Sequence, residues 1–167
     1  NNIGYQYTDC PLYWISVIYL NFAEAKAEMG SLTQDDLNNS INKLQARAGL
    51  PAMTTTPDAD PANNMGVSNL IWEIRRCRRC ELIMDNWYRY WDLIRWHQLD
   101  KLDSTKYPNT MLGANVSNVP DCEEATKNGY IDASDAQIRT YEAKHYFYPI
   151  PTTQLTLNKN MKQNPGW

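Results

Sequence analysis

The sequence predicts a mainly α-helical domain with a helical hairpin, one long helix, long irregular loops and an extended C-terminal tail. Three observations support this fold class. Apolar residues recur at steps of three and four over two stretches, Gly and Pro follow where those stretches end, and polar, turn-forming residues predominate from residue 101 onward. With 167 residues, the chain is long enough to form one domain around a single core.

Residues 12–50 are predicted to form a helical hairpin about as long as one tetratricopeptide unit. The expected apolar face of its first helix consists of Ile15, Ile18, Phe22, Ala25 and Met29. Gly30 ends this helix, and Thr33 with Asp36 has the pattern of a capping box for the second helix. The apolar positions of the second helix are Leu37, Ile41, Leu44 and Ala48. The short connection makes the two helices antiparallel, and a lone hairpin needs neighbours to bury both of its faces.

A loop over 52–66, rich in Thr, Pro, Asp and Asn, precedes a long helix predicted over about 68–99. The apolar stripe of this helix consists of Ile74, Cys77, Met84, Trp87, Trp91 and Ile94. Glu81 falls on the same face, and a buried carboxylate without a partner is strongly destabilising. We therefore expect a structural ion network beneath a Trp-rich surface, formed by Arg78, Glu81, Arg89 and Asp92, together with Arg95.

Residues 101–144 are predicted to form an irregular surface region, because the helical periodicity stops there. One short helix is expected near 133–141. The tail, 145–167, is predicted to be extended because its Tyr-Pro-Ile-Pro run excludes a helix, and a brief helical turn is expected at 153–157. Trp167 closes the chain as a large aromatic anchor.

Composition and charge exclude several classes of partner. The net charge is −3 and the basic residues are spread along the chain, which argues against nucleic acid or anionic lipid as a partner. No stretch approaches the roughly 20 apolar residues of a membrane span. The first residues also do not have the pattern of a secretory leader.

The cysteines do not predict a metal or redox site. Cys77 and Cys80 have the CxxC spacing, but no second pair completes a set of zinc ligands, and the motif lies within a helical stretch. We therefore expect these two side chains to pack in the fold, with no metal and no cofactor. Whether Cys10 and Cys122 form a disulfide stays open.

No catalytic pattern stands out, and the sequence predicts a protein that is not an enzyme. It contains no recognisable Ser–His–Asp arrangement, phosphate-binding Gly loop or HExxH motif. The acidic residues near Glu81 lie on one helix, whereas a glycosidase needs two carboxyl groups that face each other across the scissile bond.

Three pairs of segments, in this order along the chain, resemble the C-terminal region of the SusD/RagB family. They are Tyr19–Gly30 with Leu37–Pro51, Ile74–Leu82 with Arg89–Trp96, and Tyr146–Pro151 with Asn164–Trp167. Two positions depart from the family pattern. Cys77 stands where the family usually has Glu, and the stretch Ile83–Tyr88 is one residue longer than its usual counterpart.

The resemblance implies a surface-exposed lipoprotein of the cell outer membrane that captures oligosaccharides for uptake and does not cleave them. It also implies a SusC-like TonB-dependent transporter as partner. Members of the family are several times longer and attach to the membrane through an N-terminal lipidated Cys; Cys10 does not have the sequence context of that residue. We therefore expect this chain to be a C-terminal fragment without the anchor. The alternative is a tetratricopeptide-like module that binds a transporter or a peptide.

Three residues are the candidates for ligand contact within this chain: Tyr107, Tyr130 and Asn109, the last in the Asn-rich stretch 109–118. Tyr and Trp make up 17 of the 19 aromatic residues, and rings with a polar handle suit the half-wet surfaces that stack on sugars. Ordinary loop residues that bind nothing are the competing interpretation of all three.

Overall fold

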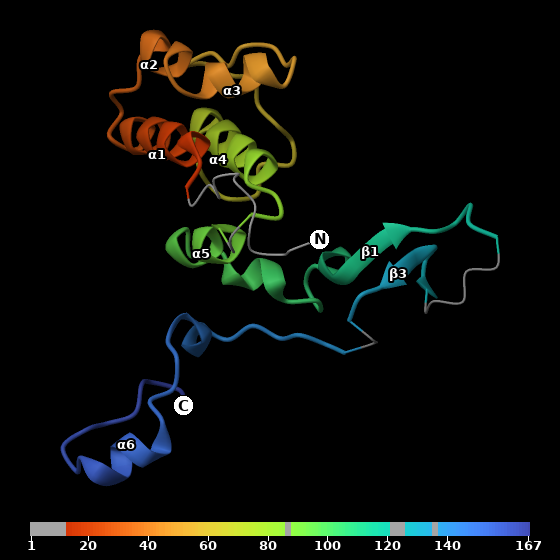
Figure 1. The fold of residues 1–167 in the computed structure, drawn as a ribbon. Helices are drawn as coiled ribbons and strands as arrows, with labels where there is room; N and C mark the ends of the chain where they lie inside the picture. The colour runs from red at the N-terminus through yellow and green to blue at the C-terminus, as the bar shows by residue number, and fades with distance from the viewer. Residues whose placement is uncertain (1–12, 86–87, 121–125, 135–136) are drawn as a thin grey trace, which may run out of the picture. The chain divides into compact units, whose positions relative to one another are not determined.

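The computed structural model describes residues 13–85, 88–120, 126–134 and 137–167 of the chain (Figure 1). It is mainly helical, as the sequence predicts, and it divides into two compact units, Asn1–Arg89 and Tyr90–Trp167. The described helices of the first unit are α1 (Ile15–Glu28), α2 (Gln34–Asn38), α3 (Ile41–Arg47) and α4 (Asn69–Glu81). The division falls within α5 (Tyr88–Arg95).

The core of the first unit forms where α1 packs against α3 and α4 (Figure 1). Its fully buried apolar side chains include Leu20, Leu37, Ile41 and Ile74. Burying one side chain of this size stabilises the fold by roughly 1.5–3 kcal/mol relative to leaving it in water. These few positions therefore contribute much of the stability of the unit.

The face of α1 that the sequence predicted to be buried is exposed, so that prediction was wrong. Its members are Ile15, Ile18, Phe22, Ala25 and Met29, and their exposed fractions, where given, range from 42% for Phe22 to 70% for Met29. The opposite side carries the buried residues Ser16, Val17, Leu20, Ala23 and Glu24. Both sides of α1 are apolar, so periodicity identifies two candidate stripes, and only the positions of α3 and α4 decide between them.

The second helix of the predicted hairpin is divided into α2 and α3. Its start is confirmed, because Thr33 and Asp36 form the expected capping box. The helix is interrupted at Asn39 and Ser40, whose side chains donate hydrogen bonds to the backbone oxygens of Asp35 and Asp36. Such local bonds compete with helical ones, which explains the break. The tetratricopeptide-like character of the hairpin stays a prediction, and residue 12 lies outside the described part of the chain.

The prediction of a single helix over 68–99 was wrong, because α4 ends at Glu81 and α5 begins at Tyr88. Residues 82–84 form a turn, in which Met84 adopts a left-handed backbone conformation with φ 67°. Asp85 in this stretch is a residue type that favours turns over helix interiors. Met84 and Trp91 are exposed rather than buried, and Trp87 lies outside the described residues.

The second unit holds the rest of α5 and a series of short elements. In chain order they are η1 (Leu99–Leu102), η2 (Pro108–Met111), β1 (Leu112–Asn115), β2 (Thr126–Lys127), β3 (Tyr130–Asp132), η3 (Ala143–Tyr146) and α6 (Thr152–Leu157). The three strands form an antiparallel sheet in the order β1-β3-β2 (Figure 1).

This sheet was not predicted, since residues 101–144 were expected to be irregular. The connection between β2 and β3 is Asn128-Gly129, and both residues have positive φ, 54° and 79°. Asn-Gly in a two-residue loop is the strongest short-range signal for a β-hairpin, and it could have revealed the pair of strands. The prediction of a short helix near 133–141 is also wrong at the described positions. Ser134 lies in a turn instead, where its backbone N–H and its hydroxyl donate hydrogen bonds to the Asp132 carboxylate.

The tail follows the prediction. It is extended around Tyr148–Pro151, and α6 forms the expected brief helical turn. The side chain of Gln163 accepts a hydrogen bond from the backbone N–H of Ile150 at 2.7 Å and donates one to the Ile150 oxygen at 2.9 Å. Trp167 anchors the end, because its Nε1 donates to the backbone oxygens of Lys144 and Phe147 at 3.2 and 2.9 Å.

Candidate functional site

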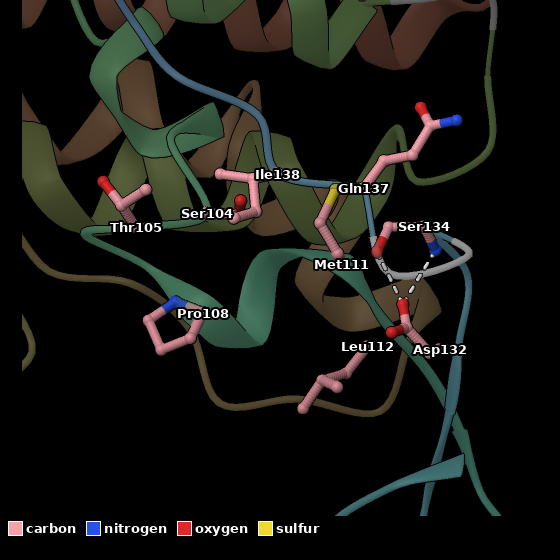
Figure 2. Close-up of a pocket in the computed structure, with 9 residues that line it drawn as sticks. All are labelled: Ser104, Thr105, Pro108, Met111, Leu112, Asp132, Ser134, Gln137 and Ile138. Carbon is pink, nitrogen blue, oxygen red and sulfur yellow. Dashed lines mark hydrogen bonds between the residues drawn. The ribbon is translucent and has the colours of Figure 1, made fainter. Parts of the chain in front are cut away.

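A pocket opens beside the small sheet of the second unit (Figure 2). It has a volume of about 200 Å³. Its lining consists of Ser104, Thr105, Pro108, Met111, Leu112, Asp132, Ser134, Gln137 and Ile138. In Figure 2, Asp132 and Ser134 lie at one end of the pocket, and Thr105 and Pro108 lie at the other.

The lining combines two kinds of surface. Hydroxyl, carboxyl and amide groups come from five of the residues, and the remaining four contribute apolar surface. A sugar ring has the same division, with hydroxyl groups around its edge and C–H bonds on its faces. The cavity is smaller than the roughly 300–1,000 Å³ of sites for drug-sized ligands.

Asp103 fixes one wall of the pocket. This residue is 4% exposed, and its carboxylate accepts hydrogen bonds from Thr105 Oγ1, from the Thr105 backbone N–H, and from the backbone N–H of Tyr141. The hydrogen bond from the Thr105 hydroxyl, followed by that from the Tyr141 amide, lowers the pKa of Asp103 from 3.8 to about 2. An ionised carboxylate therefore joins the segment that carries Thr105 to the later segment that follows Ile138.

A second pair of hydrogen bonds joins the same two segments of the chain. The backbone N–H of Ser104 donates to the oxygen of Arg139 at 2.9 Å, and the Arg139 N–H donates back to Ser104 Oγ at 3.0 Å. Ser104 and Ile138 are thus held close together, although 34 positions separate them in the sequence. The pocket is consequently built on bonded backbone segments, which favours a preformed site.

The far end of the pocket is fixed by Asp132. One of its oxygens, Oδ1, accepts hydrogen bonds from the Ser134 backbone N–H at 2.9 Å and from Ser134 Oγ at 2.6 Å (Figure 2). Asp132 ends β3, where it pairs with Leu112 of β1. The sheet therefore places Asp132, Ser134 and Leu112 around one opening.

None of the three residues predicted to contact a ligand lines this pocket. Tyr107 immediately precedes the pocket residue Pro108, and its hydroxyl accepts a hydrogen bond from Lys101 Nζ at 2.9 Å. Asn109 is exposed in η2, and Tyr130 is half-buried in β3, two residues before Asp132. The structure places all three in the elements that build the pocket, and their role in ligand binding stays a prediction.

The sequence carries a signal for the two ends of the pocket. Short polar residues next to Asp, such as Asp103-Ser104-Thr105 and Asp132-Ala133-Ser134, favour turns in which the carboxylate bonds the following residues. Their sequence separation, however, gave no reason to bring them together. The antiparallel sheet, the Ser104–Arg139 pairing and the Asp103–Tyr141 bond do so.

The residues of the predicted ion network bind several different partners. Arg78 is buried and donates to Asn21 Oδ1 at 2.8 Å, whereas Glu81 bonds Arg47 at 2.6 Å. In the second unit, Asp92 is buried and bonds Arg95 at 2.8 Å. A network that joins Arg78, Glu81, Arg89 and Asp92 stays a prediction.

Metal and redox chemistry have no support among the described residues. They contain no group of three or more His, Cys, Asp or Glu side chains placed to hold a metal ion. Cys77 is half-buried against the core of the first unit, and burial raises the pKa of its thiol to about 11, which keeps it protonated. Cys10 and Cys122 lie outside the described residues.

The described helices are also too short or too polar to cross a membrane.

Comparison with known proteins identifies the family. The model of the SusD family matches residues 1–167, which is the whole chain. This chain belongs to the SusD family. Among solved structures, it is similar to a SusD-like protein from Bacteroides fragilis, with 25% sequence identity and a TM-score of 0.60.

The match to that SusD-like protein covers 91% of this chain but 25% of the other, so this chain spans about a quarter of the solved relative. No curated protein matches the sequence. The resemblance seen in the three pairs of sequence segments is therefore confirmed at the level of the family.

Proposed function

We propose that this SusD-family chain is part of a non-enzymatic protein that captures oligosaccharides, and that the pocket beside the sheet holds one sugar ring. The amphipathic lining of a small preformed pocket is the observation that carries this proposal. Family membership supports capture at the cell outer membrane by a surface lipoprotein. It also supports a SusC-like TonB-dependent transporter as the partner that receives the sugar.

Binding without cleavage is favoured by the acidic groups at the pocket. Asp132 is the one carboxylate among the described lining residues, whereas glycoside hydrolysis commonly uses two carboxyl groups that flank the scissile bond. A single carboxylate can accept hydrogen bonds from sugar hydroxyl groups, and such charge-assisted bonds are stronger than neutral ones.

The test is affinity electrophoresis of the chain through gels that contain different polysaccharides, together with an assay for released reducing ends. We expect retardation by at least one polysaccharide and no release of reducing ends. The double variant Gln137→Ala/Ile138→Ala removes one polar and one apolar side chain from the pocket lining, both at exposed positions, and should abolish retardation. Its matched control is Gln154→Ala/Leu157→Ala in α6, also exposed and outside the pocket, which should bind normally. Retardation by no polysaccharide, or turnover by the wild-type chain, would contradict the proposal.

A protein-binding role is the alternative, and the exposed face of α1 favours it. Ile15, Ile18, Phe22 and Met29 are exposed large apolar side chains on one side of a single helix, and contiguous patches of this kind mark interaction surfaces. For a transporter-binding module, Ile18→Lys/Phe22→Lys should abolish binding to a detergent-solubilised SusC-like transporter. Retained transporter binding by this variant would exclude the face of α1 as the contact.

A further inference from the structure

One side of α1 is exposed although it is apolar along the length of the helix. Its members are Ile15, Ile18, Phe22, Ala25 and Met29, and the four large ones are 61%, 57%, 42% and 70% exposed. None of the five is charged, and the opposite side of the same helix is packed into the core of the first unit. A helix that is apolar on both sides is typical of a protein interior, where both sides are buried.

The spacing of these five residues indicates what kind of structure covers them. They follow one another at steps of three, four, three and four. This is the spacing of the apolar positions in a coiled coil, where the side chains of one helix insert between those of a second helix. From residue 15 to residue 29, at about 1.5 Å per residue, the stripe is about 21 Å long. The small Ala25, between Phe22 and Met29, leaves room for a large side chain of the second helix.

The charged residues beside the stripe are bonded within the chain. Lys26, the basic residue of α1, bonds Asp36 at 3.0 Å, and Glu28 bonds Arg75 at 2.9 Å. Lys26 is therefore not free to attach the helix to anionic lipid, which is how many interfacial helices are held. A stripe without charges also suits a permanent contact, because transient interfaces are about as polar as the rest of a protein surface.

The family comparison gives a source for the covering helix. The match covers 25% of the solved SusD-like protein, so about three quarters of that relative lie outside it. We propose that the exposed stripe of α1 packs permanently against an α-helix of the same polypeptide, in the part of the SusD-family fold that this chain does not span. The proposal concerns the first unit, so it does not depend on the pocket or on glycan binding. It assigns this face of α1 to the interior of the protein and not to the transporter.

Thiol labelling tests the contact. In the variant Ile18→Cys, iodoacetamide reports the exposure of the stripe, and peptide mass spectrometry distinguishes the introduced thiol from the native ones. Asp35→Cys in α2 is the matched control, because Asp35 is also exposed on a helix of the first unit but is not apolar. Both variants are labelled in this chain alone and in the protein expressed from the complete coding sequence.

In this chain alone, both introduced thiols should react at similar rates. In the complete protein, the thiol at position 18 should react about a hundredfold more slowly or less, because a side chain beneath a packed helix reacts only when the contact opens. The thiol at position 35 should react as before. Equal rates at the two positions in the complete protein would overturn the proposal, and so would a coding sequence that adds no residues to this chain.

Two other occupants of the face have their own outcomes, and each of them overturns the proposal. Protection of position 18 that needs the addition of a detergent-solubilised SusC-like transporter would assign the face to the transporter. Protection in this chain alone would assign it to the chain's own residues or, if it increases with protein concentration, to a second copy.

The variant Ile18→Lys/Phe22→Lys gives a second measurement. Both residues are exposed, so the Tm of this chain alone should hardly change. The Tm of the complete protein should fall by several degrees, or the protein should fail to fold, because two charges would enter a buried apolar contact. A complete protein that tolerates both lysines without loss of Tm would contradict the proposal.

Discussion

The carboxylate of Asp103 accepts a hydrogen bond from the backbone N–H of Tyr141, 38 residues further along the chain, with 3.1 Å between Oδ2 and N. This bond joins the turn after η1 to the segment that follows the pocket residues Gln137 and Ile138. The pocket therefore depends on a contact between positions that are remote in the sequence. We therefore expect the stability of the pocket to depend on whether Asp103 is ionised.

The first prediction concerns the pH dependence of that contact. Because the folded-state pKa of Asp103 is lowered from 3.8 to about 2, its stabilising effect is complete above about pH 4 and is lost as the pH falls through about 2. We expect Asp103→Asn to have a lower Tm than the wild type at pH 6, and the difference to disappear near pH 2. Thermal unfolding followed by circular dichroism between these values measures it. A Tm difference that is constant with pH would show that the lost contact does not depend on ionisation.

The second prediction tests which face of α1 is buried. Leu20 is fully buried, whereas Ile18 is 57% exposed. We expect Leu20→Ala to lower the free energy of unfolding by about 3 kcal/mol, the typical cost of emptying a packed core position. The exposed Ile18→Ala should change it by no more than about 0.5 kcal/mol. Urea denaturation of the two variants gives both values, and the reverse order would restore the face predicted from the sequence.

These two predictions mark what the sequence could and could not determine. The capping box of Thr33 and Asp36 was predictable, because its partners lie three residues apart. The buried side of α1 was not, because both of its sides are apolar and the choice depends on packing against α4, more than 40 residues away in the sequence. Local chemistry thus predicted helix starts, glycine stops and the turn of α6. It also predicted the buried positions Leu37, Ile41 and Leu44 of the second helix, but not the buried face of α1.

The same distinction applies to the pocket. The prediction of Tyr107, Asn109 and Tyr130 as ligand contacts rests on residue type alone, as aromatic or amide residues of an irregular region. The polar groups of the pocket are instead Ser, Thr, Asp and Gln side chains that are unremarkable singly. The pairing of β1 with β3 and that of Ser104 with Arg139 bring them together. The hairpin signal at Asn128-Gly129 would have indicated the pairing of β2 with β3, and hence the strand that Asp132 ends, but not the pairing of β3 with β1.

The third prediction concerns that hairpin turn. Gly129 has φ +79°, and a Cβ at this position would collide with the side chain of Ser117. We expect Gly129→Ala to destabilise the second unit by about 1 kcal/mol or more, since an L-residue is strained in this conformation even without a clash. Asn128→Gly is the matched control, because Gly also accepts the positive φ of 54° at that position. Hydrogen exchange at the amides of β3 would report the change, and equal protection in both variants would contradict it.

The last prediction compares two glutamates of the first unit. The Glu81 side chain is 17% exposed and bonds Arg47, whereas the Glu28 side chain is 48% exposed and bonds Arg75. We expect Glu81→Ala to lower the Tm more than Glu28→Ala, because the carboxylate of Glu81 is the less exposed of the two. Arg47 is 65% exposed, so a double-mutant cycle on Arg47 and Glu81 should give a coupling energy of only about 0.5 kcal/mol. A much larger coupling would indicate that Glu81 belongs to a buried network, as first inferred from its position on the helix. Equal Tm values for the two alanine variants would instead show that neither carboxylate is buried enough to matter.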